Sequence, residues 1–448
     1  MERRKVLEKF QDRAWRERAE ANIEKYRKGD LRLTVTDGEG RPIPHASVKI
    51  TQVKHEFRFG ANLFMLDEME TEEKNALYRR YFADVFNMAT LPFYWNTVEP
   101  ERGKTRYHKG CAPWYRRPAI DLCMEYCDEH GIEPREHALA YERTFPDWLQ
   151  GADVETVKRE LERRYGEIAD RYKDKIRTIE VTNEMDWGEG KTAFYDAPDY
   201  VEWCFKTAER YFPHNQLVIN EWTEGAWTDV CRPTAKYYAY TQAAMLKGAR
   251  VDAIGMQYHM FFTREMEAEK GRALYDPVQL NRRMDLYTQL CPHLQVTEIT
   301  VPAYSEEAED EAIQAELLEN LYTLWFSHPS MEQIVYWNLV DGYAYVPDPT
   351  PEAISRTRGN MEAGENVYYG GLLRFDMTPK PAYYTLKKLI CETWHTEHRA
   401  EADAAGSLSF RGFYGEYRAE ITANGKTVAL PLTLSSHGPQ EIALTIEA

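Results

Sequence analysis

The sequence lacks the long apolar stretches of a membrane protein and the apolar centre of a secretion signal. Its first 30 residues, MERRKVLEKFQDRAWRERAEANIEKYRKGD, are highly charged, whereas a secretion signal contains about 7–15 consecutive apolar residues. No later run approaches the ~20 apolar residues that a membrane-spanning helix needs. We therefore expect no membrane partner and, if Met1 is the native start, a cytoplasmic protein. A chain trimmed of its signal would be secreted and would look the same.

Metal-binding cysteine pairs and phosphate-binding glycine loops are also missing. The seven cysteines are scattered, and no two of them form a CxxC pair, which favours buried thiols in a reducing compartment over zinc sites or a disulfide framework. Neither GxGxxG nor GxxxxGK[ST] occurs, which argues against nucleotide binding. We expect no cofactor and no metal.

Positive charge is scarce relative to negative charge. The chain has 56 Lys and Arg against 73 Asp and Glu, a formal net charge of −17. Nucleic-acid binding depends on clustered cations that release counterions, so nucleic acid is excluded as a partner. The composition does include 30 Tyr and 11 Trp, some of which could stack on flat sugar rings. A neutral oligosaccharide or polysaccharide is the substrate that fits best, and the oligomeric state stays open.

Short apolar runs alternate with longer amphipathic stretches through the centre of the chain. Eight β units, each followed by a helix, predict an α/β protein with a (β/α)8 TIM barrel, although periodicity alone also allows an open, doubly wound sheet. The candidate strands cover residues 57–62, 86–91, 135–141, 178–183, 217–220, 253–259, 294–298 and 334–338.

The two ends of the chain have a different pattern. Residues 3–28 predict a charged amphipathic helix, and 31–36 and 46–53 predict strands separated by the turn-rich DGEGRPIP. Residues 405–448 again alternate, with Asn424-Gly425 as a hairpin signal. We expect an N-terminal helix and hairpin segment (1–54), a catalytic barrel (55–397) and a C-terminal β segment (398–448). The two terminal segments would form one small accessory β module.

Polar side chains stand where the candidate strands end. Since these ends meet at one mouth in a parallel barrel, such groups should share a cavity. Two facing carboxylates suit glycoside cleavage, one as proton donor and the other as nucleophile or base. Glu184 and Glu298 follow different strands, and the competing carboxylates are Glu142, Glu180, Glu221 and Asp341. Glu180, four residues before Glu184, should lie deeper as a structural hydrogen-bond acceptor.

These motifs, in their order, resemble glycoside hydrolase family 10, the retaining β-1,4-xylanases. IEVTNEM (179–185) resembles the acid/base motif, which implies that Glu184 is the acid/base, and VTEIT (296–300) resembles the nucleophile motif, which implies that Glu298 is the nucleophile. RxH (135–137), FPDWL (145–149) and GMQYH (255–259) match other signatures, and the N-terminal VTDGEGRPIPHASV resembles the β module of the plant-like branch.

The resemblance also implies roles for the surrounding side chains. Asn183 should bind the 2-hydroxyl of the sugar at the cleavage site, His259 and Gln257 should fix the nucleophile and the sugar, and His137 should contact a sugar hydroxyl. The residues expected to stack on sugar rings are Trp337, Tyr141 and Trp95.

Several departures from the family concern the substrate. Tyr94 stands where the family has a Lys that binds the sugar beyond the cleaved one, Tyr141-Glu142 replaces Trp-His, and Thr300 replaces Asp. A site built to hydrogen-bond one hydroxyl rejects analogues that lack it, so these exchanges should alter specificity. A long insertion, residues 342–370, should wall or cover the mouth.

Three hypotheses follow. The leading one is a retaining glycoside hydrolase that acts by double displacement on β-linked glycans, in the manner of an endo-1,4-β-xylanase. The alternatives are a β-glycosidase of the same clan with another glycan or short oligosaccharides as substrate, and a non-catalytic carbohydrate-binding barrel. A metal-dependent hydrolase, with His137, His259 and Glu298 as metal ligands, is disfavoured because the sequence contains no HxH or HExxH pair.

Overall fold

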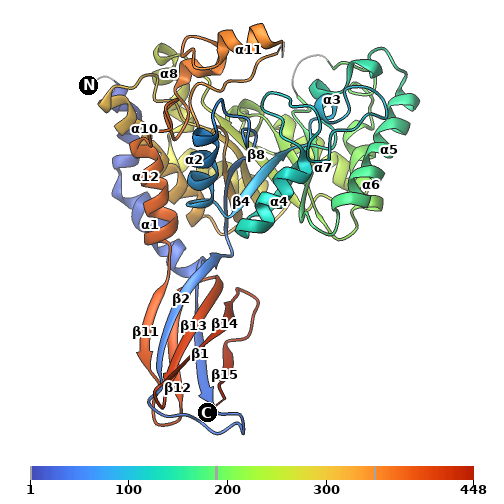
Figure 1. Cartoon of the computed structure of the whole chain (residues 1–448). Helices are drawn as coiled ribbons and strands as arrows, with labels where there is room; N and C mark the ends of the chain where they lie inside the picture. The colour runs from blue at the N-terminus through green and yellow to red at the C-terminus, as the bar shows by residue number, and fades with distance from the viewer. Residues whose placement is uncertain (1–2, 187–189, 348–349, 448) are drawn as a thin grey trace.

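A closed barrel of eight parallel strands forms the larger part of the molecule (Figure 1). This computed structural model describes residues 3–186, 190–347 and 350–447. The first and last barrel strands pair with each other, with Phe59 opposite Ile334, so the sheet closes and the open-sheet alternative is wrong. The predicted TIM barrel is confirmed. Its strands are β3 (Arg58–Asn62), β4 (Met88–Pro92), β5 (Glu133–His137), β6 (Thr178–Asn183), β7 (Gln216–Glu221), β8 (Ala253–His259), β9 (Leu294–Thr300) and β10 (Met331–Tyr336).

Amphipathic helices surround the barrel. In α5 the side chain of Asp153 accepts a hydrogen bond from the Thr156 amide at 2.7 Å, an N-cap that starts the helix, and the apolar face from Val157 to Ile168 is buried. The helices of this part are α2 (Glu72–Ala83), α3 (Trp95–Val98), α4 (Ile120–His130), α5 (Val154–Tyr172), α6 (Tyr200–Tyr211), α7 (Lys236–Leu246), α8 (Arg264–Leu274), α9 (Pro277–Tyr287), α10 (Ala308–Ser327), α11 (Pro351–Thr357) and α12 (Pro381–Lys388). Single turns are η2 (Glu142–Thr144), η3 (Asp147–Leu149), η4 (Glu224–Thr228), η5 (Gly364–Tyr368) and η6 (Leu389–Thr393).

The N-terminal segment is two short helices instead of the single helix predicted over 3–28. A 3₁₀ helix, η1 (Arg3–Gln11), is followed by α1 (Arg13–Tyr26). The break lies at Asp12, whose extended backbone and side-chain bond to the Ala14 amide start a new helix.

The two ends of the chain form one β sandwich, which confirms the predicted accessory module. One sheet has the order β12-β1-β15 and the other β11-β2-β13-β14. Asn424 and Gly425 both have positive φ, 51° and 76°, as a two-residue hairpin turn requires, and they join β13 to β14. The module strands are β1 (Lys28–Thr36), β2 (Ser47–His55), β11 (Glu397–Glu401), β12 (Ser407–Phe413), β13 (Gly415–Ala423), β14 (Lys426–Leu434) and β15 (Glu441–Thr445).

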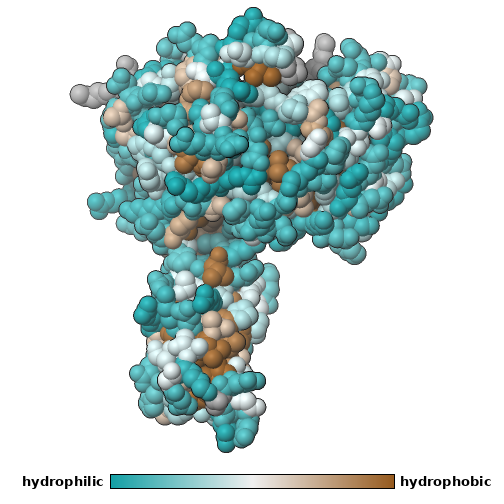
Figure 2. Space-filling view, in the orientation of Figure 1, coloured by the Kyte–Doolittle hydropathy of each residue, from teal (hydrophilic) through white to brown (hydrophobic). Residues whose placement is uncertain are grey.

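The sandwich has a core of its own, distinct from that of the barrel. Leu33, Ile50 and Ile421, from both of its sheets, are fully buried together. In Figure 1 the module stands below the barrel, at its own end of the molecule, while α1 lies beside α10 and α12. The face of the molecule in Figure 2 is mostly hydrophilic, with hydrophobic side chains gathered over the module. Within the described residues, no helix has the length and apolar character needed to cross a membrane.

Arg27, at the end of α1, joins the N-terminal segment to the barrel. Its guanidinium donates to the carbonyls of Phe326, His328 and Met331 at 2.6, 2.5 and 2.7 Å, and it lies 4.8 Å from the centre of the Phe57 ring. The first two carbonyls are at the C-terminal end of α10, where helical acceptors lack partners. Burial lowers the pKa of Arg27 to about 10, so the side chain is still charged at neutral pH.

Replacing Arg27 by Met should therefore destabilise the fold. The variant keeps a long stem but leaves three buried acceptors without a charged donor, and we expect a loss of about 2–4 kcal/mol. Urea or thermal unfolding measures it. Arg418→Met, at an exposed position of β13, is the matched control and should change stability by less than about 0.5 kcal/mol. Equal stabilities of the two variants would contradict the anchoring role.

Candidate active site

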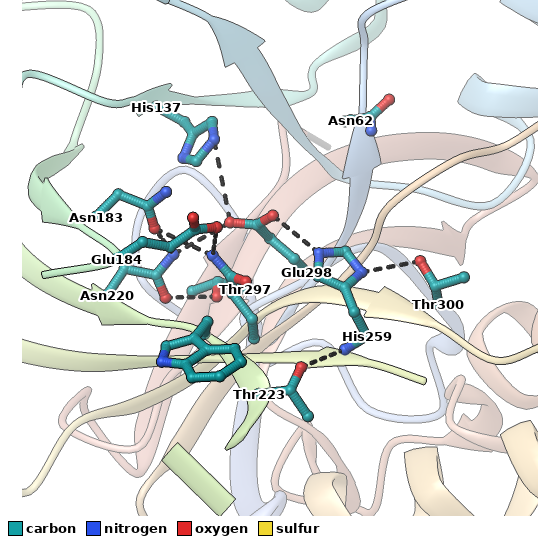
Figure 3. A network of polar contacts seen from close by, with 12 residues as sticks. Asn62, His137, Asn183, Glu184, Asn220, Thr223, His259, Thr297, Glu298 and Thr300 are labelled. Atoms are coloured by element: carbon teal, nitrogen blue, oxygen red, sulfur yellow. Dashed lines mark hydrogen bonds and ion pairs between the residues drawn. The ribbon is translucent and has the colours of Figure 1, made fainter. Parts of the chain in front are cut away.

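A cavity of about 940 Å³ opens at the C-terminal ends of the barrel strands. Several of the side chains predicted for the site line it, and they come from the ends of five strands, β5, β6, β8, β9 and β10. Figure 3 shows Glu184 and Glu298 pointing toward each other across this space. The predicted residues in its wall are Tyr141, Asn183, Glu184, Gln257, His259, Glu298 and Trp337.

Glu298 lies in β9 and is held on both carboxylate oxygens. Oε1 accepts from the Asn220 amide at 3.2 Å, and Oε2 lies 3.1 Å from His259 Nε2. His137 Nε2 is 4.0 Å from Oε1. Burial raises the pKa of Glu298 to about 8, an effect that His137 opposes and the nearby carboxylates increase.

Glu184 directly follows β6 and reaches the cavity from the opposite side. Its φ of 51° is left-handed, which is uncommon for a residue with a side chain and turns the backbone at the strand end. The Tyr141 hydroxyl donates to Oε2 at 2.7 Å, and Gln257 donates to Oε1 at 3.0 Å. Glu184 therefore has two fixed donors and faces the cavity.

Three amide side chains connect the carboxylates to each other. Asn183 Oδ1 accepts from Asn220 at 2.9 Å and from Gln257 at 3.1 Å. Asn220 also donates to Glu298, and Gln257 also donates to Glu184. A continuous chain of hydrogen bonds thus sets the relative position of the two carboxylates.

A fully buried ionic group underlies this chain. Glu180 accepts from Arg135 Nη2, from His137 Nδ1 at 2.8 Å and from Asn220 at 3.2 Å, as expected for a deep structural acceptor. Burial alone would raise the pKa of Glu180, but the charges of His137 and Arg135 and these hydrogen bonds lower it below its usual value. Thr297 donates to Asn220 Oδ1 at 2.7 Å and fixes the orientation of that amide.

The remaining candidate carboxylates are used inside the protein. Glu221 accepts from the Met185 amide at 3.1 Å and from the Tyr240 hydroxyl. Asp341 accepts from the Gly371 amide at 2.6 Å and lies 2.5 Å from Lys380 Nζ. Glu142 accepts from the Thr192 amide at 2.5 Å. Their internal partners leave Glu184 and Glu298 as the pair that faces the cavity.

His137, Glu180 and Glu298 approach one another closely enough to suggest a metal site. One ligand atom from each lies within 4.8 Å of the others. Glu180 is already paired with a guanidinium, however, and both oxygens of Glu298 have donors. This donor set is satisfied by hydrogen bonds, and a cation would have to displace them.

Two predicted sugar contacts are corrected by the structure. Trp95 is 1% exposed and donates to Glu99 at 2.8 Å, and it packs in the core against Phe145, so its ring face cannot stack on a sugar. His137 is 0% exposed, and its two nitrogens contact Glu180 and the Tyr94 hydroxyl, the latter at 3.0 Å. Its ring therefore supports the site from behind.

Several residues of the site received no role from the sequence. Asn220 was visible only as one of many polar strand ends, yet it binds four partners of the network, Glu180, Asn183, Thr297 and Glu298. Phe64, to which no motif pointed, packs beside Tyr94 and the predicted Trp337 in an aromatic cluster at the cavity wall. A loop of residues 106–119 places Arg116 and Arg117 in the same wall, and no periodic pattern in that segment points to the cavity.

A parallel barrel with two facing carboxylates at the C-terminal strand ends has the architecture of a barrel glycoside hydrolase. The chain matches the sequence profile of Glycosyl hydrolase family 10 over residues 51–388. It belongs to that family, as the sequence motifs predicted.

Relatives and solved structures agree with this assignment. The chain is 25% identical to anti-sigma-I factor RsgI6 of Acetivibrio thermocellus over 92% of its length, and 24% identical to endo-1,4-beta-xylanase 1 of Arabidopsis thaliana over 91%. It covers only 47% and 38% of those proteins. Native xylanase 10B of Thermotoga maritima has the same fold, with a TM-score of 0.57, 20% identity, and coverage of 75% of this chain and 96% of that one.

His259 gives a test of the site's electrostatics. Burial lowers the pKa of His259 to about 4, and its Nδ1 faces the Thr300 hydroxyl at 2.9 Å. Thr300→Asp would place a carboxylate there, which stabilises the protonated ring. The pKa of His259 should rise by about 1–3, so the ring should stay charged to a higher pH.

An NMR titration of the His259 ring, assigned by its loss in His259→Gln, measures this shift. Thr300→Ser keeps the hydroxyl and is the control, with a titration close to that of the unchanged protein. If the Asp and Ser variants titrate alike, Thr300 does not set the charge of His259.

Proposed function

We propose that the chain is a retaining glycoside hydrolase that cleaves β-linked glycans, with Glu298 as nucleophile and Glu184 as acid/base. The observation that carries this proposal is the placement of the two carboxylates: they come from two different strands, β6 and β9, point into one cavity, and are linked through Asn183, Asn220 and Gln257.

In the first step Glu298 attacks the anomeric carbon of the bound sugar. The carboxylate must be ionised. Burial opposes this by raising its pKa, and the hydrogen bonds from the Asn220 amide and from His259 Nε2–H stabilise the charged form. A neutral His259 can carry its proton on Nε2 if Nδ1 accepts from Thr300. As the glycosidic bond breaks, Glu184 gives its proton to the leaving oxygen, and a covalent glycosyl ester with Glu298 remains.

In the second step water replaces the departed alcohol. Glu184, now a carboxylate with donors from Tyr141 and Gln257, takes a proton from the water as its oxygen attacks the anomeric carbon. The ester bond to Glu298 breaks and the sugar leaves with its original configuration. Asn183 is positioned to bind the 2-hydroxyl, and Trp337 supplies an aromatic wall.

The substrate we infer is a β-1,4-linked xylan or a close relative of it. The name of the Arabidopsis relative, endo-1,4-beta-xylanase 1, and the xylobiose in a structure of Thermotoga petrophila xylanase 10B support this class. A different β-glycan is the second candidate, because Tyr94 spends its hydroxyl on His137 at 3.0 Å and offers the substrate an aromatic face.

Trapping the glycosyl intermediate tests the nucleophile. Incubation with 2-deoxy-2-fluoro glycosides that carry a good leaving group, followed by peptide mass spectrometry, should label the peptide that contains Glu298. The fluorine slows both steps, and the good leaving group keeps the first step fast enough for the intermediate to accumulate. The sugar that reacts also identifies the glycone. Glu298→Gln should prevent labelling and turnover, whereas Glu416→Gln, at an exposed position of β13, should change neither. Unchanged turnover by Glu298→Gln would contradict the assignment of Glu298 as the nucleophile.

Replacement of Glu184 tests the proton donor. Glu184→Gln should lower kcat/KM on oligosaccharides by about 10²–10⁴, with a smaller loss on aryl glycosides whose leaving group needs no proton. Added azide should restore aryl glycoside turnover and give a β-glycosyl azide, since a small anion can attack without a base. An α-azide, or equal losses on both substrate types, would contradict the assignment.

A further inference from the structure

Arg117 is a buried cation in the wall of the active-site cavity. Its side chain is contributed by the loop of residues 106–119, between α3 and α4, and only 6% of the residue is exposed. The guanidinium lies 4.2 Å above the centre of the Tyr94 ring and 4.9 Å from that of Phe64. Burial lowers the pKa of Arg117 to about 10, which leaves it charged at neutral pH.

Within the described residues this charge has no ion-pair partner, and the carboxylate that acts on it from farther away is Glu365, in the wall of the same cavity. Across residues 3–186, 190–347 and 350–447, no carboxylate lies within 4.0 Å of the Arg117 guanidinium. Its one hydrogen bond is from Nη1 to the Arg116 carbonyl at 2.7 Å, and Nε has no partner. A buried guanidinium without an anion is costly, so an anion that arrives with a ligand would be bound strongly.

Arg116 adds a second cation and fixes the loop. Its guanidinium donates to the Tyr343 carbonyl and, at 3.0 Å, to Asn338 Oδ1, and its Nε also lacks a partner. The neighbouring Tyr115 donates to the Ala344 carbonyl at 3.2 Å. The loop is thereby attached to the segment after β10, and the two arginines are held in place before any ligand binds.

The position of Arg117 relates it to the reacting sugar. Tyr94 lies under the guanidinium and contacts His137, which is 4.0 Å from Glu298. Two side chains thus separate Arg117 from the nucleophile. An anion bound there belongs to a unit next to the attacked sugar, on the side of the cavity that His137 supports.

We propose that Arg117, with Arg116 beside it, binds the carboxylate of a uronic acid unit in the glycan substrate. This inference rests on the proposed function and narrows its substrate to β-glycans that carry an acidic sugar. A carboxylate matches the planar fork of a guanidinium and is the anion that glycans commonly bear on the sugar itself. A glycan segment that carries one carboxylate would match this site, because one of its arginines, Arg117, has no ion-pair partner among the described residues.

The test compares an oligosaccharide that carries one glucuronic acid unit with its carboxyl-reduced counterpart, which differs only in the loss of the charge. The unchanged protein should cleave the acidic one with a kcat/KM at least about tenfold higher, because a hydrogen-bonded charge pair replaces an unpaired cation. In Arg117→Gln the ratio of the two kcat/KM values should fall toward one. Arg117→Lys, which keeps the charge and loses the fork, should give an intermediate ratio.

Arg418→Gln, in the β module, is the matched control and should leave the ratio unchanged. Equal use of both substrates by the unchanged protein, or an unchanged ratio in Arg117→Gln, would overturn the inference while the proposed function stands. If neither substrate is cleaved and no intermediate is trapped, the proposed function fails. In that case the affinities of the two oligosaccharides for the unchanged protein, measured by calorimetry, still test the role of Arg117. Equal affinities would overturn the inference that Arg117 binds a carboxylate. The same binding measurement serves if Arg117→Gln does not fold.

Discussion

The site depends on one buried ion pair, that between Glu180 and Arg135 at the base of the cavity. Both side chains are 0% exposed, and a carboxylate at such depth must be matched by a cation and by hydrogen bonds. Glu180 in turn orients His137 and Asn220. Because Asn220 also binds Asn183 and Glu298, the relative position of Glu184 and Glu298 depends on a buried group that does not line the cavity.

The sequence was sufficient for the architecture because the barrel has a strong local signature. Each predicted strand corresponds to a barrel strand, with ends that differ by a few residues. The candidate strand 135–141, for example, corresponds to β5, which runs over Glu133–His137. The Asn424-Gly425 turn was predictable for a similar reason, since few residue pairs adopt two positive φ angles. The convergence of Glu184 and Glu298 followed from topology alone: carboxyl ends of parallel strands share one mouth.

Features that depend on side-chain direction could not be predicted in this way. Trp95 and Trp337 are both aromatic residues near strand ends, but only Trp337 lines the cavity; Trp95 begins α3 and turns into the core, where Glu99 holds its indole. His137, at the end of β5, is likewise buried and does not line the cavity. The periodicity of a helix or strand predicts which of its residues face the core. It does not predict the conformation of a loop, such as residues 106–119, that contributes to the cavity wall.

The net charge of the chain disfavours an acidic substrate, whereas the charge of Arg117 in the cavity favours an acidic sugar. The two effects differ because they act over different distances. The net charge of −17 acts through solvent, where salt screens interactions beyond about 8–10 Å. It disfavours a long polyanion, which must pass many surface carboxylates. A single carboxylate in the cavity meets Arg117 at short range, over aromatic rings and away from water, where screening is weak and the attraction is larger. A neutral backbone with an occasional acidic unit satisfies both conditions, and the spacing of its acidic units, more than its total charge, would then decide which segments of the glycan reach Glu298.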